Sequence, residues 1–150
     1  MFCLGGLAWF TGKPFIFPSL GPTAFLLSYR TDAATFSAWQ VIGGHLWGTV
    51  AGLACYHLVV SGAVLMDLAV PLSAAGLRLA ASGALATGVT TALMIATRSV
   101  HPPACATTLI VSLGLLTTPV EGAIIVGAVT ILYSVSQGLS IIWSTGFSTE

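Results

Sequence analysis

Two consecutive prolines between apolar stretches constrain this fold more than any other feature. Pro102 and Pro103 separate the apolar stretch 80–97 from the apolar stretch 104–116. A proline has no backbone N–H, and its ring clashes with the preceding helical turn, so neither residue fits inside a regular helix. Proline is tolerated in the first turn of a helix. The pair therefore predicts a chain break, followed by a new helix that starts at Ala104.

Composition places this break in a membrane protein. The chain has 150 residues, of which 56% are hydrophobic and 5% are charged, whereas soluble domains contain about 25% charged residues. So few charges cannot cover a water-exposed surface, and we expect a single domain, 1–150, embedded in a lipid bilayer. Four basic and four acidic residues leave no basic patch, which argues against nucleic acid as a partner.

The apolar stretches predict an all-α membrane protein with about four transmembrane helices and two short, proline-broken half-helices. A helix needs about 20 residues to cross a bilayer. The stretches 38–60, 77–97 and 119–143 are long enough, whereas 1–12 is too short to cross by itself. The short helices are expected at 23–29, after Pro22, and at 104–116. Broken helices in a membrane need protein or water around them, so both breaks are candidate sites.

The two halves of the sequence have the same order of a span, a broken short helix and another span. Transporter folds are often built from such repeats, and their broken segments mark the binding site. We therefore expect an internal repeat with re-entrant short helices. Lys13, Arg30 and Arg98 would then lie on one side, the cytoplasmic one, and Arg78 on the other. If the short helices cross fully, the four cations divide evenly.

Small residues recur every four positions on three spans. Such ridges let helix backbones approach closely in lipid, and we expect the two long ridges, on consecutive spans, to pack tightly against other helices. The three ridges comprise Gly44, Gly48 and Gly52; Ala80, Ala84, Gly88, Ala92 and Ala96; and Ala123 with Gly127.

The starts of the two short helices are the predicted binding site. Helix N-termini expose unpaired N–H groups and a partial positive charge, which suit an anion. The expected amide donors are those of Ala104, Cys105 and Ala106 at the second break, and of Thr23 and Ala24 beside Gly21 at the first. The hydroxyl groups of Ser19 and Thr23 would lie near the first break, and Thr107 would add another hydroxyl.

Three ionisable side chains complete the candidate site. His101 adjoins the second break, and an unperturbed imidazole with a pKa of about 6.5 can donate, accept or carry a proton. Arg98 either extends to the membrane surface or steers an anion. His45 either serves a pore or makes an interhelical hydrogen bond.

The acidic residues are absent from the middle of every span, where cation pathways usually place carboxylates or rings of carbonyls. This pattern favours a small monovalent anion or a small neutral solute. The sequence contains no Ser-His-Asp set, phosphate loop or paired carboxylates, and no closed set of three or four zinc ligands. We therefore expect no enzymatic activity, cofactor or bound metal. A non-transporting scaffold, whose breaks only pack the bundle, is the rival interpretation.

Three stretches resemble the HPP family of integral membrane proteins. They are Leu20-Gly21-Pro22-Thr23-Ala24-Phe25-Leu26-Leu27, Gln40-Val41-Ile42-Gly43-Gly44-His45-Leu46 and Met94-Ile95-Ala96-Thr97-Arg98-Ser99-Val100-His101-Pro102-Pro103-Ala104. The resemblance covers nearly the whole chain and implies four spans. Plastid and cyanobacterial members are described as nitrite transporters, so it also implies nitrite as the first candidate substrate.

Two departures from the family pattern stand out. The first span is short, and Cys105 replaces the glycine that usually follows His-Pro-Pro-Ala. With few spans a monomer encloses little space, so we expect a homo-oligomer, located in the inner membrane of a prokaryote.

Overall fold

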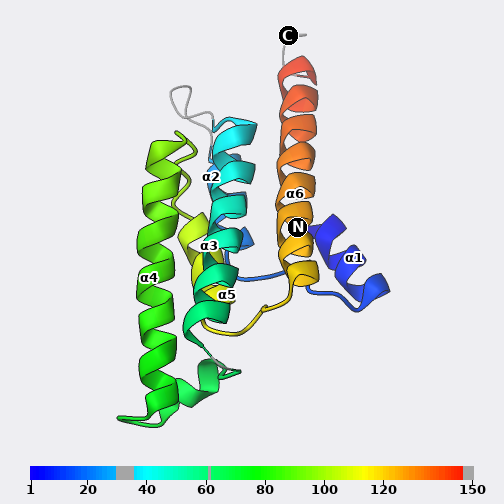
Figure 1. Ribbon diagram of the computed structural model, residues 1–150. Coiled ribbons are helices and arrows are strands. Elements are labelled where there is room, and N and C mark those ends of the chain that lie inside the picture. Colours follow the sequence, from blue (N-terminus) through cyan, green and yellow to red (C-terminus); the bar gives the residue numbers. More distant parts are fainter. Residues whose placement is uncertain (30–35, 61, 147–150) are drawn as a thin grey trace.

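The computed structural model describes residues 1–29, 36–60 and 62–146, and every regular element in these ranges is helical (Figure 1). The predicted all-α class is therefore confirmed. The elements are α1 (Phe2–Thr11), α2 (Leu20–Ser28), the π-helix η1 (Trp39–Gly43), α3 (Gly44–Val59), the 3-10 helix η2 (Leu65–Ala69), α4 (Ala74–Ala96), α5 (Ala104–Ser112) and α6 (Pro119–Gly146).

Two helices in the described part of the chain are long and apolar enough to cross a membrane. They are α4, with 23 residues, and 24 residues of α6, Pro119–Ile142. The five residues of η1 continue directly into the 16 residues of α3, which makes a third continuous helical stretch of similar length. Helix α1 has 10 residues, too few to cross alone, as expected. Four crossings remain a prediction.

Helix α5 begins at Ala104, as the two prolines predict, with Pro103 at its N-cap. It ends at Ser112, four residues before the predicted end. The cause is Gly114, whose φ of 84° is left-handed. The amide of Gly114 donates to the carbonyl of Val111, and the amide of Leu115 donates to the carbonyl of Ile110. These two bonds form a Schellman motif, which terminates helices at glycine.

Helix α2 begins at Leu20, three residues before the predicted start. Pro22 is the third residue of the helix, still within the first turn, where its missing N–H costs no helical hydrogen bond.

The glycine ridge of α3 packs as predicted. A Cβ at Gly44 would lie 2.9 Å from Cβ of His101, one at Gly48 would lie 2.8 Å from the carbonyl oxygen of Ala104, and one at Gly52 would lie 2.8 Å from Cβ of Val111. Only glycine leaves room for these approaches. The ridge therefore brings α3 into direct contact with the proline break and with α5.

The predicted packing of the α4 ridge is wrong for the isolated chain. The five small residues of the α4 ridge face outward and are exposed. Helix α4 instead buries a face with hydroxyl groups, on which Thr90 Oγ1 lies 2.9 Å from Thr108 Oγ1, and Ser82 Oγ donates to the carbonyl of Ser112 at 3.0 Å. These hydrogen bonds to α5 select the buried face. On α6, a Cβ at Gly127 would have no neighbour within 4 Å.

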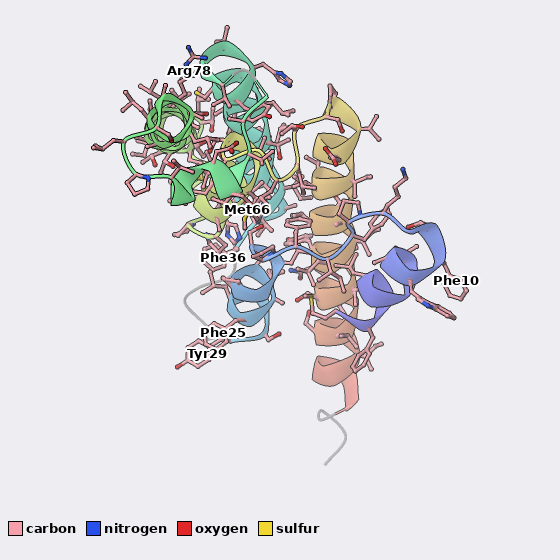
Figure 2. The ribbon with its side chains drawn as sticks, turned by 90° about the horizontal axis from the view of Figure 1, so that it is seen from below. Phe10, Phe25, Tyr29, Phe36, Met66 and Arg78 are labelled. Carbon is pink, nitrogen blue, oxygen red and sulfur yellow. The ribbon has the colours of Figure 1, made fainter. Side chains whose placement is uncertain are left out.

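Helix α6 stands beside the α3–α4–α5 group and carries α1 on its outer side (Figure 1). Residues 125, 128, 129 and 132 of α6 form a buried apolar cluster with Leu20 and Leu27 of α2, Val41 of η1 and residues 110 and 111 of α5. In Figure 2, Phe10 of α1 lies at the outer edge of the molecule, and Phe25 and Tyr29 project together from α2, stacked with ring centroids 5.6 Å apart.

The predicted sorting of cations remains a prediction. Lys13 interacts electrostatically with Glu121, the third residue of α6. Arg78 lies near the start of α4, and Arg98 follows the end of the same helix. Arg30 lies outside the described residues.

Candidate functional site

Five polar side chains meet where α2, α3 and the start of α5 come together. Ser19, Thr23, His45, His101 and Thr107 each have 0% of their surface exposed. We call these five residues the polar cluster. They come from three parts of the sequence, so the cluster depends on the tertiary fold.

Short hydrogen bonds connect all five members. Ser19 Oγ lies 2.7 Å from Thr107 Oγ1, and Thr107 Oγ1 lies 2.7 Å from His45 Nδ1. Thr23 Oγ1 lies 3.0 Å from His45 Nε2 and 3.2 Å from His101 Nε2. The Thr23 hydroxyl also donates to the carbonyl of Ser19 at 3.0 Å. The two imidazole centroids are 5.3 Å apart.

The local sequence around each residue of the polar cluster explains where its side chain lies. Ser19 is the N-cap of α2, and Thr23 lies one turn further on. His45 is the second residue of α3, directly after the π-helix, an element often found at functional sites. His101 can approach α3 because Gly44 has no side chain at the contact. At about 1.5 Å per residue, His45 lies roughly 9 Å from the start of η1 and roughly 21 Å from the end of α3, so it is nearer one end of this helical stretch than its middle.

One arrangement of the hydrogen atoms forms all of the hydrogen bonds of the polar cluster at the same time. In it, the single hydrogen of the Thr23 hydroxyl goes to the Ser19 carbonyl, which can only accept. Both imidazoles then donate from Nε2 to Thr23 Oγ1. The Nδ1 atom of a neutral His45 then accepts from the Thr107 hydroxyl, and Thr107 accepts from Ser19. Thr23, His45 and Thr107 thus each both donate and accept, and Ser19 donates its single hydrogen.

Among the described residues, His101 Nδ1 is a buried polar atom that has no hydrogen-bond partner. In the arrangement above it carries a free lone pair. The ring of Phe36 meets the His101 ring edge-on, with centroids 5.4 Å apart and an interplanar angle of 82°, and Figure 2 shows Phe36 beside α2. A buried polar group left unpaired costs about 1–3 kcal/mol, so this atom calls for a ligand or a function.

The expected amide donors at the second break are not free. The amides of Ala104, Cys105 and Ala106 donate to the carbonyls of His101, Pro102 and Pro103 at 2.9, 3.0 and 3.1 Å. The Thr23 amide bonds to the Ser19 carbonyl at 3.4 Å. The prediction of an anion held by open backbone amides is therefore wrong. Tight turns at the start of each helix already provide carbonyl acceptors for these amides.

The remaining predicted site residues lie outside the polar cluster. Arg98 is exposed and has a left-handed backbone with φ of 56°. Gly21 is exposed, and Ala24 is half-buried against the apolar cluster of α6. Cys105 and Ala106 are half-buried on α5. The structure thus brings together four hydroxyl and imidazole side chains around Thr23, and none of the predicted backbone donors.

For His45, the structure contains the interhelical hydrogen bonds that the sequence left as one of two options. Sequence reasoning missed Phe36, because no motif marks a lone aromatic residue outside a helix. It placed the Thr23 hydroxyl near the site but gave Thr23 the role of an amide donor rather than of the central hydroxyl. The signal available was its position one turn after Ser19 on a short broken helix, which directs the two hydroxyl groups to the same face.

Comparison with known proteins identifies one family. The family model described as "HPP, transmembrane region" matches residues 1–145. No curated protein and no solved structure matches the chain.

Proposed function

Since the chain belongs to the HPP family of transmembrane proteins, we propose that it transports a small monovalent anion, with nitrite as the first candidate. The proposal is that the anion passes through the polar cluster. The single observation that supports it most is the unpartnered Nδ1 atom of His101 at 0% exposure. Buried ionisable groups in membrane proteins are expensive and usually serve function.

A purely structural role explains the polar cluster less well. Membrane helices pack through small residues, and the α3 glycine ridge already holds α3 against α5. Burying two imidazoles adds desolvation cost, and one imidazole nitrogen remains unpaired. The unpaired nitrogen does not stabilise a scaffold. A transport site, in contrast, needs an atom that is free to bind and release a solute.

The chemistry of the polar cluster favours an anion over a cation. Its side chains carry no carboxylate, and its one atom without a partner, His101 Nδ1, becomes an N–H donor when it takes up a proton. Among the described acidic residues, Asp67 caps the 3-10 helix η2, and Glu121 accepts from the amides of Thr117 and Thr118 at the start of α6. Both carboxylates are thus engaged in capping local turns. A small neutral solute is the second candidate, because neutral hydroxyl groups also bind it.

Purified protein in liposomes tests this function. We expect nitrite to enter these vesicles faster than empty ones. The His101→Ala variant should reduce the excess rate at least about tenfold, because it removes the unpaired nitrogen and one donor to Thr23. Stopped-flow measurements with nitrite, formate, chloride and urea give the comparison. If only urea moves faster, the neutral-solute candidate replaces the anion. If no solute does, the scaffold interpretation stands.

We also propose that the chain forms a homo-oligomer through the outward ridge of α4. The ridge lies on a helix long enough to cross the membrane, and a Cβ at Gly88 would have no neighbour within 4 Å. An open groove runs along this surface, lined by residues 83, 84, 87, 88, 91, 92, 95 and 109. Small residues at this spacing allow two helices to approach closely in lipid.

Disulfide cross-linking tests the oligomer. In a variant without the three native cysteines, Gly88→Cys should give a covalent dimer on mild oxidation in membranes, since a disulfide needs Cβ atoms about 4 Å apart. Val50→Cys, at an exposed position of α3, serves as the matched control and should remain monomeric. Equal cross-linking at both positions, or none at Gly88, would contradict this interface.

A further inference from the structure

We infer that the anion crosses the polar cluster together with a proton, as an undissociated weak acid, and that His101 Nδ1 is the atom that exchanges this proton. The inference rests on the proposed transport function and narrows it to a substrate class. That class is small monoprotic weak acids, such as nitrous and formic acid.

The hydrogen-bond arrangement singles out His101 Nδ1. His101 already donates from Nε2 to Thr23, so a proton can add at Nδ1 without moving any other hydrogen. His45 Nδ1 instead accepts from Thr107 at 2.7 Å. A proton on that atom would require the Thr107 hydroxyl to turn away and the Ser19 hydroxyl to follow. The two histidines thus have different roles. His45 holds the Thr23 hydroxyl in place, whereas His101 keeps one nitrogen, Nδ1, available for a proton.

Charge is the second argument. The members of the polar cluster carry no permanent charge, and each is fully buried. An anion that entered alone would lack a counter-charge, and burying an isolated charge is expensive. A weak acid HA that enters in its undissociated form brings no net charge. Its O–H bond can then break and an N–H bond form at His101 Nδ1, while the electron pair stays on the oxygen, which leaves A⁻ beside an imidazolium. The reverse transfer releases HA.

The described residues around His101 include one other group that could exchange a proton, the imidazole of His45. Among the described residues, the titratable group that faces His101 is His45 of α3. Thr23 of α2 bonds to His101 Nε2, and the ring of Phe36 makes a T-shaped contact with the imidazole. Cys105 on α5 makes no hydrogen bond to the ring, whose Nε2 bonds to Thr23 and whose Nδ1 has no partner.

Nitrite and nitrate provide the sharpest comparison, because they are similar in size and charge but only nitrite is the base of a weak acid. In liposomes that contain a pH-sensitive dye, an inward nitrite or formate gradient should acidify the interior, one proton per anion. Above the leak of empty vesicles, the nitrite rate should rise by up to about tenfold for each unit the pH falls, as expected when one proton is taken up per anion. Nitrate and chloride should stay at the empty-vesicle rate.

The variant His101→Gln tests proton exchange at His101 separately from the hydrogen bond between His101 and Thr23. A glutamine side chain can donate to Thr23 as Nε2 does but cannot titrate, so we expect the acidification to fall to the empty-vesicle level. His57→Gln is the matched control and should keep the wild-type acidification. His57 is exposed and bonds from Nε2 to the carbonyl of Thr117, remote from the polar cluster in sequence and contacts.

The outcomes separate this inference from the transport function beneath it. Nitrite, nitrate and chloride moving at similar rates without protons would overturn the weak-acid inference while anion transport stood. Proton-coupled nitrite flux that persisted in His101→Gln would remove His101 Nδ1 as the exchanging atom. No flux of any anion would overturn the proposed function itself. Selectivity for nitrite over nitrate is measured on the native protein, so it does not depend on whether a variant folds.

Discussion

Replacing Thr23 with valine should reduce nitrite flux to the level of empty vesicles. Valine has nearly the shape of threonine but no oxygen, and Thr23 Oγ1 accepts from both imidazoles. Two buried N–H groups would lose their partner, at about 1–3 kcal/mol each. Both rings would then turn to find other acceptors, and the geometry around His101 Nδ1 would be lost. Liposome flux measured beside size-exclusion chromatography separates a folded, inactive protein from an unfolded one.

Two further variants make the Thr23 result specific. Thr23→Ser keeps the oxygen and should retain most of the flux. Thr130→Val is the matched control, since the Thr130 hydroxyl donates to the carbonyl four residues earlier, as Thr23 does, but it is exposed on α6. It should leave flux unchanged. Full activity in Thr23→Val would mean that the polar cluster is not on the transport path.

Replacing Gly48 with alanine should destabilise the protein by about 1–3 kcal/mol, the usual cost of overfilling a packed contact. The new Cβ would lie 2.8 Å from the carbonyl oxygen of Ala104 and 2.9 Å from Thr108 Oγ1. The first of these is backbone in the first turn of α5, which can yield only if α5 moves away from α3. Denaturant unfolding in detergent micelles measures the change in the free energy of unfolding.

Gly127→Ala gives the opposite expectation. A Cβ at Gly127 meets nothing within 4 Å, and alanine favours helix over glycine by up to about 1 kcal/mol. The α6 variant should therefore be as stable as the wild-type protein or slightly more so. Similar destabilisation by both substitutions would show that the cost comes from helix flexibility rather than from the contact between α3 and α5.

The sequence was most informative where a single residue type has one physical consequence. Two prolines cannot continue a helix, and α5 starts directly after them. Glycines at every fourth position of α3 predicted close packing, and Gly44, Gly48 and Gly52 make it. The same pattern failed on α4, because helical periodicity shows which residues share a face but not whether that face meets this chain or another.

The sequence predicted where the candidate site lies but not which chemical groups form it. The breaks at Ser19–Thr23 and at His101 do meet, since hydroxyl groups and imidazoles from both bond to one another. The amides assigned to hold the anion are instead used inside the tight turns. Whether a helix starts with free donors or with a tight turn depends on backbone angles just before it, and the residues at this break permit both.

Complete burial of the polar cluster has a consequence for kinetics. If the chain transports a solute through this cluster, the solute reaches the five side chains only when neighbouring helices separate, and the structure then corresponds to an occluded state. Each passage then requires opening on one side and later on the other, and collective helix motions of this kind take microseconds to milliseconds. Turnover would be set by these motions and would saturate with solute concentration, in the manner of a carrier.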